Sequence, residues 1–282
     1  MRTMRDIVNA RQIFNRALDV DPDCGRAWAG LAATYGFEYM YYNATDVNRE
    51  EALRTSNRAV ELAPERVESH VLAGIANCIT RNYGMADAEF RKAIDLEPKN
   101  FEAFYYFGRT KVREGELEEA LKLFERAARV RPEDYESVLF QAQLHVSLGH
   151  QKRARAVSHE GIARVRNALE LNPDDNRALN LGAFALLRLG ETREAEEWIK
   201  TSLRNEPMDS IIRYNAACFY ALKGDSEKAL DCLENCLVKV GQVNSEWLEH
   251  DSDLDSIRDH PRYPGIIASI TDNATNMTMP ES

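Results

Sequence analysis

The stretch ADAEFRKAIDLEP at residues 86–98 is followed 34 residues later by ALKLFERAARVRP at residues 120–132. Both stretches begin with alanine, carry phenylalanine at the fifth place and alanine at the eighth, and end on proline. Outward from them, in steps of 34 to 42 residues, the closing proline recurs at Pro22, Pro64, Pro98, Pro132, Pro173 and Pro207. This period, with apolar residues at helical spacing before each proline, predicts an array of helical repeats.

Small residues recur at fixed places in this array. They are Ala10, Ala52, Ala86, Ala120 and Ala195, then Ala17, Ala59, Ala93 and Ala127, and in the first half of each repeat Gly74, Gly108, Ala142, Ala183 and Ala217. Two helices approach closely only where side chains are small, so these places predict the contacts inside each hairpin. Larger residues (Phe14, Phe90, Phe124 and Ile199) are predicted to fill the space between repeats. The first helices are predicted to end at Gly115, Gly149, Gly190 and Gly224.

A 34-residue period is typical of the tetratricopeptide repeat, which has two antiparallel helices per unit. Over about residues 5–240 the sequence resembles tetratricopeptide-repeat proteins. The resemblance implies an all-α fold, a right-handed superhelix (α-α solenoid) of about six helical hairpins plus a leading helix. We expect the solenoid over residues 1–246, a C-terminal capping segment over 247–270 and a disordered tail over 271–282. The open end should be covered by Trp247, Leu254, Ile257, Tyr263 and Ile266.

The period lengthens twice, by eight residues before Pro64 and by seven before Pro173. Seven residues make about two helical turns, so the second helix there can lengthen to about residues 151–171 and keep its facing. This helix carries a basic strip in an acidic chain, made of Lys152, Arg153, Arg155, Arg164 and Arg166. The strip is interpreted first as a solvated outer face and, as the alternative, as a docking strip for an acidic partner.

The first helices of such repeats line a concave face. At the inward places of two repeats stand Tyr105, Arg109 and Arg113, and Asn180, Phe184 and Arg188. Arginine binds carboxylates or carbonyl oxygens and aromatic rings supply contact area, so we predict that this groove holds an extended peptide. The alternative is a groove filled by contacts within the chain or by water.

The leading helix, at about residues 6–20, has no partner helix before it. An amphipathic helix without a partner exposes an apolar face. We therefore expect that copies of this chain can self-associate through it.

The chemistry expected of this chain is limited. The sequence lacks the motifs of nucleotide binding, serine hydrolysis and zinc proteolysis, so we predict no enzyme, no cofactor and no small-molecule substrate. Cys218, Cys232 and Cys236 are a weak zinc candidate because buried cysteine is an ordinary small hydrophobe. Residues 251–255 begin like a calcium loop but lack its glycine and its closing glutamate. We predict no metal site.

Charge and composition exclude further classes. There are 46 Asp and Glu residues against 36 Lys and Arg, a formal net charge of -10, which opposes binding to nucleic acid. No apolar run reaches about 18 residues, so we expect no membrane span, and the N-terminus lacks a secretory pattern. Five cysteines without framework spacing favour reduced thiols and a cytoplasmic location.

A narrower resemblance rests on Tyr214–Gly224, on Glu227–Leu230 and on the cap from Trp247 to Tyr263. These segments, with the lengthened repeat around residues 39–59 and with residues 166–173, resemble the C-terminal part of bacterial multidomain regulators. The resemblance implies a partner-sensing module joined to a nucleotide cyclase, a kinase or a DNA-binding domain. Two functions therefore stay open. The chain is a non-catalytic scaffold or adaptor for a protein or peptide partner, or it is the regulatory half of a larger signalling protein.

Overall fold

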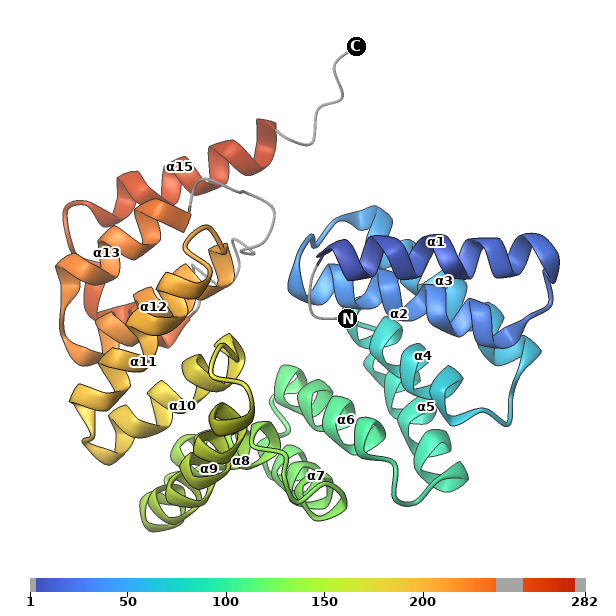
Figure 1. Ribbon diagram of the computed structural model, residues 1–282, viewed down its shortest axis with the longest axis horizontal. Helices are drawn as coiled ribbons and strands as arrows, with labels where there is room; N and C mark the ends of the chain where they lie inside the picture. The colour runs from blue at the N-terminus through green and yellow to red at the C-terminus, as the bar shows by residue number, and fades with distance from the viewer. Residues whose placement is uncertain (1–3, 237–250, 277–282) are drawn as a thin grey trace. The chain divides into compact units, whose positions relative to one another are not determined.

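The computed structural model describes residues 4–236 and 251–276, and every regular element in them is helical (Figure 1). The chain divides into two compact units, residues 1–148 and residues 149–282. The boundary falls at Gly149, inside the hairpin whose second helix was predicted to be long. The range predicted for the solenoid, residues 1–246, includes residues of both units.

The first unit contains eight helices in its described residues: α1 (Met4–Val20), α2 (Gly25–Tyr41), α3 (Asp46–Leu62), α4 (Val67–Ile79), α5 (Tyr83–Leu96), α6 (Phe101–Glu114), α7 (Leu117–Val130) and α8 (Glu136–Ser147). Three successive pairs, α2 with α3, α4 with α5 and α6 with α7, pack as hairpins. The first helices α2, α4 and α6 also pack on one another in that order, so they form one layer. This layer is where the candidate peptide-binding surface lies.

The second unit contains α9 (Gln151–Leu171), α10 (Asn176–Leu189), α11 (Thr192–Asn205), α12 (Ser210–Lys223), α13 (Ser226–Glu234), the 3₁₀ helix η2 (Ser252–Ile257) and α15 (Tyr263–Asn276). Helix α9 has 21 residues where α7 and α11 have 14, and its bounds agree with the predicted range 151–171. The inserted residues therefore lengthen one helix by two turns, as expected from the helical repeat.

The helix ends follow local chemistry. Asn100, Asp175 and Asp209 cap the N-termini of α6, α10 and α12 with side-chain oxygens that accept backbone N–H groups. The predicted glycines end the first helices in the left-handed region, with φ between 76° and 86°. At the equivalent place after α4 stands Arg81, which adopts φ 61° although it carries a Cβ atom.

Glycines of the first helices meet aromatic rings of the second. A Cβ atom built on Gly74 would lie 2.7 Å from the Phe90 ring, and one built on Gly108 would lie 3.1 Å from the Phe124 ring. The phenylalanines were predicted to fill the space between repeats, and they do so only in part. Each ring first rests on the glycine of its own hairpin, and Phe90 also stacks on Phe107 of the next hairpin, with ring centroids 5.3 Å apart.

The two ends of the chain differ from the middle. At the start, α1 packs on α2 with Ile7 fully buried, whereas Ile13 and Val20 of α1 are exposed.

At the other end, η2 packs on α12 and α15 packs on α13. The expected capping residues Leu254, Ile257, Tyr263 and Ile266 are buried, and Trp247 lies outside the described residues. Helix α15 continues to Asn276, past residue 271 where a disordered tail was expected to begin, and residues 277–282 are not described.

Candidate functional site

A hollow lies in the first unit, on the layer formed by α2, α4 and α6. It is lined by Met40 of α2, by Ile75, Cys78 and Ile79 of α4, and by Tyr106, Arg109, Thr110 and Arg113 of α6. The side chains from α2 and α4 are all apolar, so they form an apolar floor. Of the six groove residues predicted from the sequence, Arg109 and Arg113 line this hollow.

Arg109 is held in place by aromatic residues. Its Nη1 donates a hydrogen bond of 2.5 Å to the hydroxyl of Tyr41. Its guanidinium lies 5.6–6.0 Å from the ring centroids of Tyr41, Tyr105 and Tyr106. Burial raises the pKa of the Tyr106 phenol, so its hydroxyl stays protonated. The hydrogen bond and the ring contacts together hold the Arg109 side chain in place at one side of the hollow. We call this side chain the rigid wall of the hollow.

Tyr105 and Arg113 differ in accessibility. Tyr105 is buried, and its hydroxyl donates a hydrogen bond to Glu136 of α8. Arg113 is exposed, and no acidic side chain in the described part of the chain pairs with it. The neighbouring Val112 is also exposed. Tyr105 therefore helps to hold the Arg109 guanidinium in place. The guanidinium of Arg113 is an exposed positive charge at the edge of the hollow.

The predicted groove residues of the second unit lie in three different environments. Asn180 is only 3% exposed, and its amide nitrogen donates to the Ser202 hydroxyl at 2.5 Å and to the Asn176 carbonyl at 2.7 Å. It therefore joins α10 to α11. Phe184 is half-buried and meets the Phe219 ring edge to face, and Arg188 is exposed.

The sequence contained a signal for the buried amide of Asn180. Ser202 stands at a place that holds alanine in several other repeats. A hydroxyl at a close helix contact requires a polar partner on the facing helix.

The inner side of α12 is covered by the chain itself. The Tyr214 hydroxyl donates to Asp251 at 2.5 Å, and the Ser256 hydroxyl donates to the Ala221 carbonyl at 3.0 Å. The Cys218 thiol lies 3.8 Å from the same Asp251 carboxylate. Burial, and next to it the neighbouring Asp251, raise the pKa of the Asp253 carboxyl. The segment around η2 thus occupies the inward places of α12.

Cys218, Cys232 and Cys236, the weak zinc candidate, do not form a group of metal-ligand atoms in the described part of the chain. Cys218 lies instead beside two aspartates. Ligand atoms of Cys218, Asp251 and Asp253 lie within 4.8 Å of one another, and this is the one such group among the described residues. Within that cluster, the Asp251 carboxylate accepts hydrogen bonds from the Tyr214 hydroxyl and from the Asp253 backbone N–H. Cys232 and Cys236 are buried, and burial raises their thiol pKa values to about 11 and about 12. They are packing residues, with little thiolate to offer.

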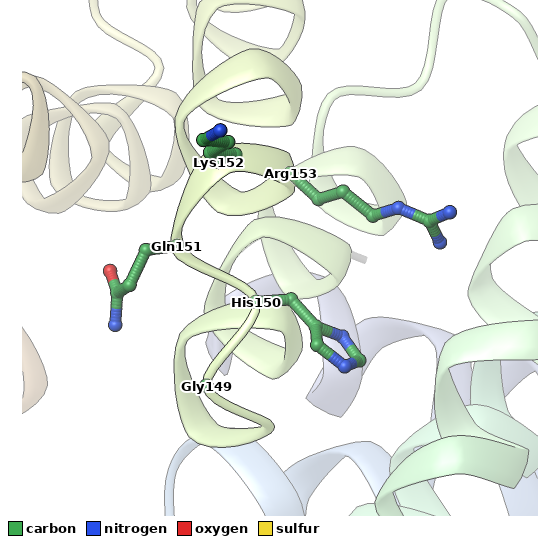
Figure 2. A pocket seen from close by; sticks show the side chains of 5 residues that line it. All are labelled: Gly149, His150, Gln151, Lys152 and Arg153. Carbon is green, nitrogen blue, oxygen red and sulfur yellow. The ribbon is translucent and has the colours of Figure 1, made fainter.

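The basic strip on α9 is divided into two halves. Arg164 pairs with Glu160 at 2.6 Å, and Arg166 pairs with Glu194 of α11 at 2.8 Å. The other three cations, Lys152, Arg153 and Arg155, are exposed, and no described acidic residue pairs with them. Figure 2 shows the Arg153 side chain extending away from the helix. Residues 149–153 line a hollow at the surface.

None of the helices in the described ranges combines the length and apolar character that crossing a membrane requires.

Two segments, residues 105–157 and residues 211–237, match the tetratricopeptide repeat family.

Two curated relatives align with part of the chain. Superkiller protein 3 of Schizosaccharomyces pombe is 26% identical over 162 residues, which cover 57% of this chain and 12% of that protein. Interferon-induced protein with tetratricopeptide repeats 3 of Mus musculus is 32% identical over 130 residues, which cover 46% of this chain and 31% of that protein. The chain therefore spans less than a third of either relative.

Two solved structures are similar in fold to this chain over nearly its whole length. The human IFIT1 dimer with m7Gppp-AAAA has a TM-score of 0.67 at 16% identity and covers 99% of this chain and 69% of that chain. The Cut9–Hcn1 hetero-tetramer of the APC/C has a TM-score of 0.62 at 16% identity and covers 98% of this chain and 50% of that chain. At this identity the likeness concerns the fold alone. The chain therefore contains tetratricopeptide repeats, and its all-helical fold is that of tetratricopeptide-repeat proteins.

Proposed function

We propose that this chain is a protein-interaction module and that the hollow on α2, α4 and α6 binds an extended segment of a partner protein. One observation carries the proposal: an apolar floor lies directly beside Arg113, an exposed cation that no described residue neutralises. An apolar side chain of the partner would rest against the shallow apolar floor, and a neighbouring carboxylate would pair with Arg113. Charge-assisted hydrogen bonds from arginine to carboxylate are strong and directional.

The rigid wall favours binding for an entropic reason. Arg109 is already held by Tyr41 and by two further tyrosine rings, so it loses little side-chain freedom when a ligand arrives. Preorganised groups gain affinity because they avoid that loss. In this proposal Arg113 contacts the partner, and Arg109 and Tyr105 support it. The other three predicted groove residues, Asn180, Phe184 and Arg188, belong to the second unit and do not line this hollow.

A peptide fits this hollow better than RNA does. The comparison structure of IFIT1 contains an m7Gppp-AAAA ligand, but that chain is only 16% identical to this one. RNA affinity depends on neutralising many phosphates, whereas this hollow offers one free cation on a chain of net charge -10. The further expectations of no catalysis, a cytoplasmic location and a role as the sensing half of a larger regulator stay predictions.

The test is peptide display against the full chain. Random peptides selected on the wild type should contain an apolar residue next to Asp or Glu. Their affinity should fall about tenfold with Arg113→Glu, because the change replaces attraction by repulsion at one partly exposed site.

Arg129→Glu is the matched control, since Arg129 is an exposed arginine of the outer helix α7 and lies outside the hollow. A second probe is a photo-crosslinking residue at Val112, which should label the selected peptides. Equal binding by the two charge variants, or no label from position 112, would place the partner elsewhere.

A further inference from the structure

The first turns of α9 carry an excess of positive charge that the rest of the described chain leaves unneutralised. Lys152, Arg153 and Arg155 are all exposed and lie within four successive residues. The second half of the same helix has its arginines paired with glutamates of α9 and α11. Since α9 offers both kinds of arginine, it contains its own control.

The placement of these cations works against helix stability. No acidic residue stands in the first turn of α9, and the N-cap residue His150 makes no capping hydrogen bond through its side chain. The N-terminus of a helix carries a partial positive charge, so cations there are unfavourable and anions are favourable. Departures from such local rules are expected where a residue serves function.

We propose that Lys152, Arg153 and Arg155 form a second docking surface, which binds a short acidic segment of a partner protein. The surface lies in the second unit and is independent of the hollow in the first. At 100° per residue, Arg153 and Arg155 lie on either side of Lys152 on the exposed side of the first turns of α9. An extended segment that crosses the helix there would contact all three, and acidic residues spread along it would neutralise the surface.

Longer polyanions fit this surface poorly. Further along α9 and beside it, the exposed side chains include Glu160, Glu170 and Glu191. Glu160 and Glu191 are paired with Arg164 and Arg166, so a nucleic-acid strand that continued past the three cations along α9 would find no further unpaired arginine there. Anionic membranes are recognised by clusters of about four to eight basic residues, more than this surface has. A short acidic peptide needs no more than these three cations.

The experiment uses the full chain and a fluorescent peptide that contains Glu-Asp-Glu-Asp between glycines. Its affinity is measured by fluorescence anisotropy at low ionic strength and then at rising salt. The variant Arg153→Gln/Arg155→Gln should bind about tenfold more weakly, because two exposed ion pairs are lost. The variant Arg164→Gln/Arg166→Gln removes the same charge from the same helix and should bind as the wild type does. The melting temperature of the first variant should be unchanged or higher, which separates lost binding from misfolding.

Three further probes complete the test. A Gln-Asn-Gln-Asn peptide should not bind, since it has the shape without the charge. The Arg113→Glu variant should bind the acidic peptide normally, so failure of the hollow and failure of this surface are distinguishable. An oligoadenylate with the same number of charges should bind more weakly than the peptide. The proposal is overturned if the wild type does not bind the acidic peptide, if both double variants lose it equally, or if the oligoadenylate binds more tightly.

Discussion

Replacing Gly74 with alanine tests whether close helix approach determines the repeat. The added Cβ atom would lie 2.7–2.8 Å from three atoms of the Phe90 ring, about 1 Å closer than ordinary contact. Phe90 is fully buried and stacked on Phe107, so the ring has no free space to enter. Overpacking of this kind costs about 1–3 kcal/mol, and the better helix propensity of alanine returns about 1 kcal/mol. We expect a net loss of up to about 2 kcal/mol in the free energy of unfolding.

Two other glycines provide graded controls. At Gly108 the same atom would lie 3.1–3.2 Å from the Phe124 ring, so a small shift suffices and the two effects should nearly cancel. At Gly84, near the start of α5, nothing lies within 4 Å, so alanine should stabilise by about 0.5 kcal/mol.

The assay is urea unfolding followed by circular dichroism, with thermal midpoints as a second readout. A change of 1 kcal/mol should move the midpoint by about 2–4 °C for a unit of this size. A Phe90→Leu change in the Gly74→Ala background should recover part of the loss, because a smaller side chain makes room. If the three alanine variants did not rank in the order Gly84, Gly108, Gly74 from most to least stable, the ring contact would not be what requires glycine.

Three further outcomes are expected. Arg81→Gly should raise the free energy of unfolding by about 0.5–1 kcal/mol in urea titrations, since glycine adopts φ 61° without the clash of a Cβ atom. Asn180→Ala should lower it by about 1–2 kcal/mol, and adding Ser202→Ala should cost little more, because both changes remove the same buried hydrogen bond. A hydrogen bond from the Lys223 ammonium lowers the pKa of Glu196 from 4.5 to about 2. The stability from this pair is therefore full above pH 4.5 and lost as the pH falls through about 2, and acid titration of Glu196→Gln should lack that part of the decrease.

Features that depend on the local repeat could be predicted from the sequence. The bounds of α9 followed from an insertion of two helical turns, and the left-handed glycines followed from the requirements of a helix end. The burial of Leu254 and Ile257 followed from their apolar character beside an open end. The first two need only residues close in the chain, and the third needs only the place of the segment after the last repeat.

The remaining features depend on residues far apart in the sequence. Arg153 and Arg166 are both exposed arginines of α9, yet Arg166 is neutralised by Glu194 from another helix. Asn180 occupies an inward place of the repeat, yet Ser202 draws its amide into the helix contact. The periodicity predicts which helix face a residue occupies. It does not predict which distant group forms a hydrogen bond with that residue or neutralises its charge. The same reason explains why the sequence could not show that Arg109 is hydrogen-bonded to Tyr41 of another helix whereas Arg113 is exposed.

The contact between Gly74 and Phe90 also constrains which substitutions are compatible with one another at these two positions of the hairpin. Enlarging the glycine first forces a clash, whereas shrinking the ring first leaves a void that a later methyl group can fill. Either change alone costs stability, whereas a smaller side chain at position 90 makes room for a Cβ atom at position 74. The two positions are therefore expected to change as a pair.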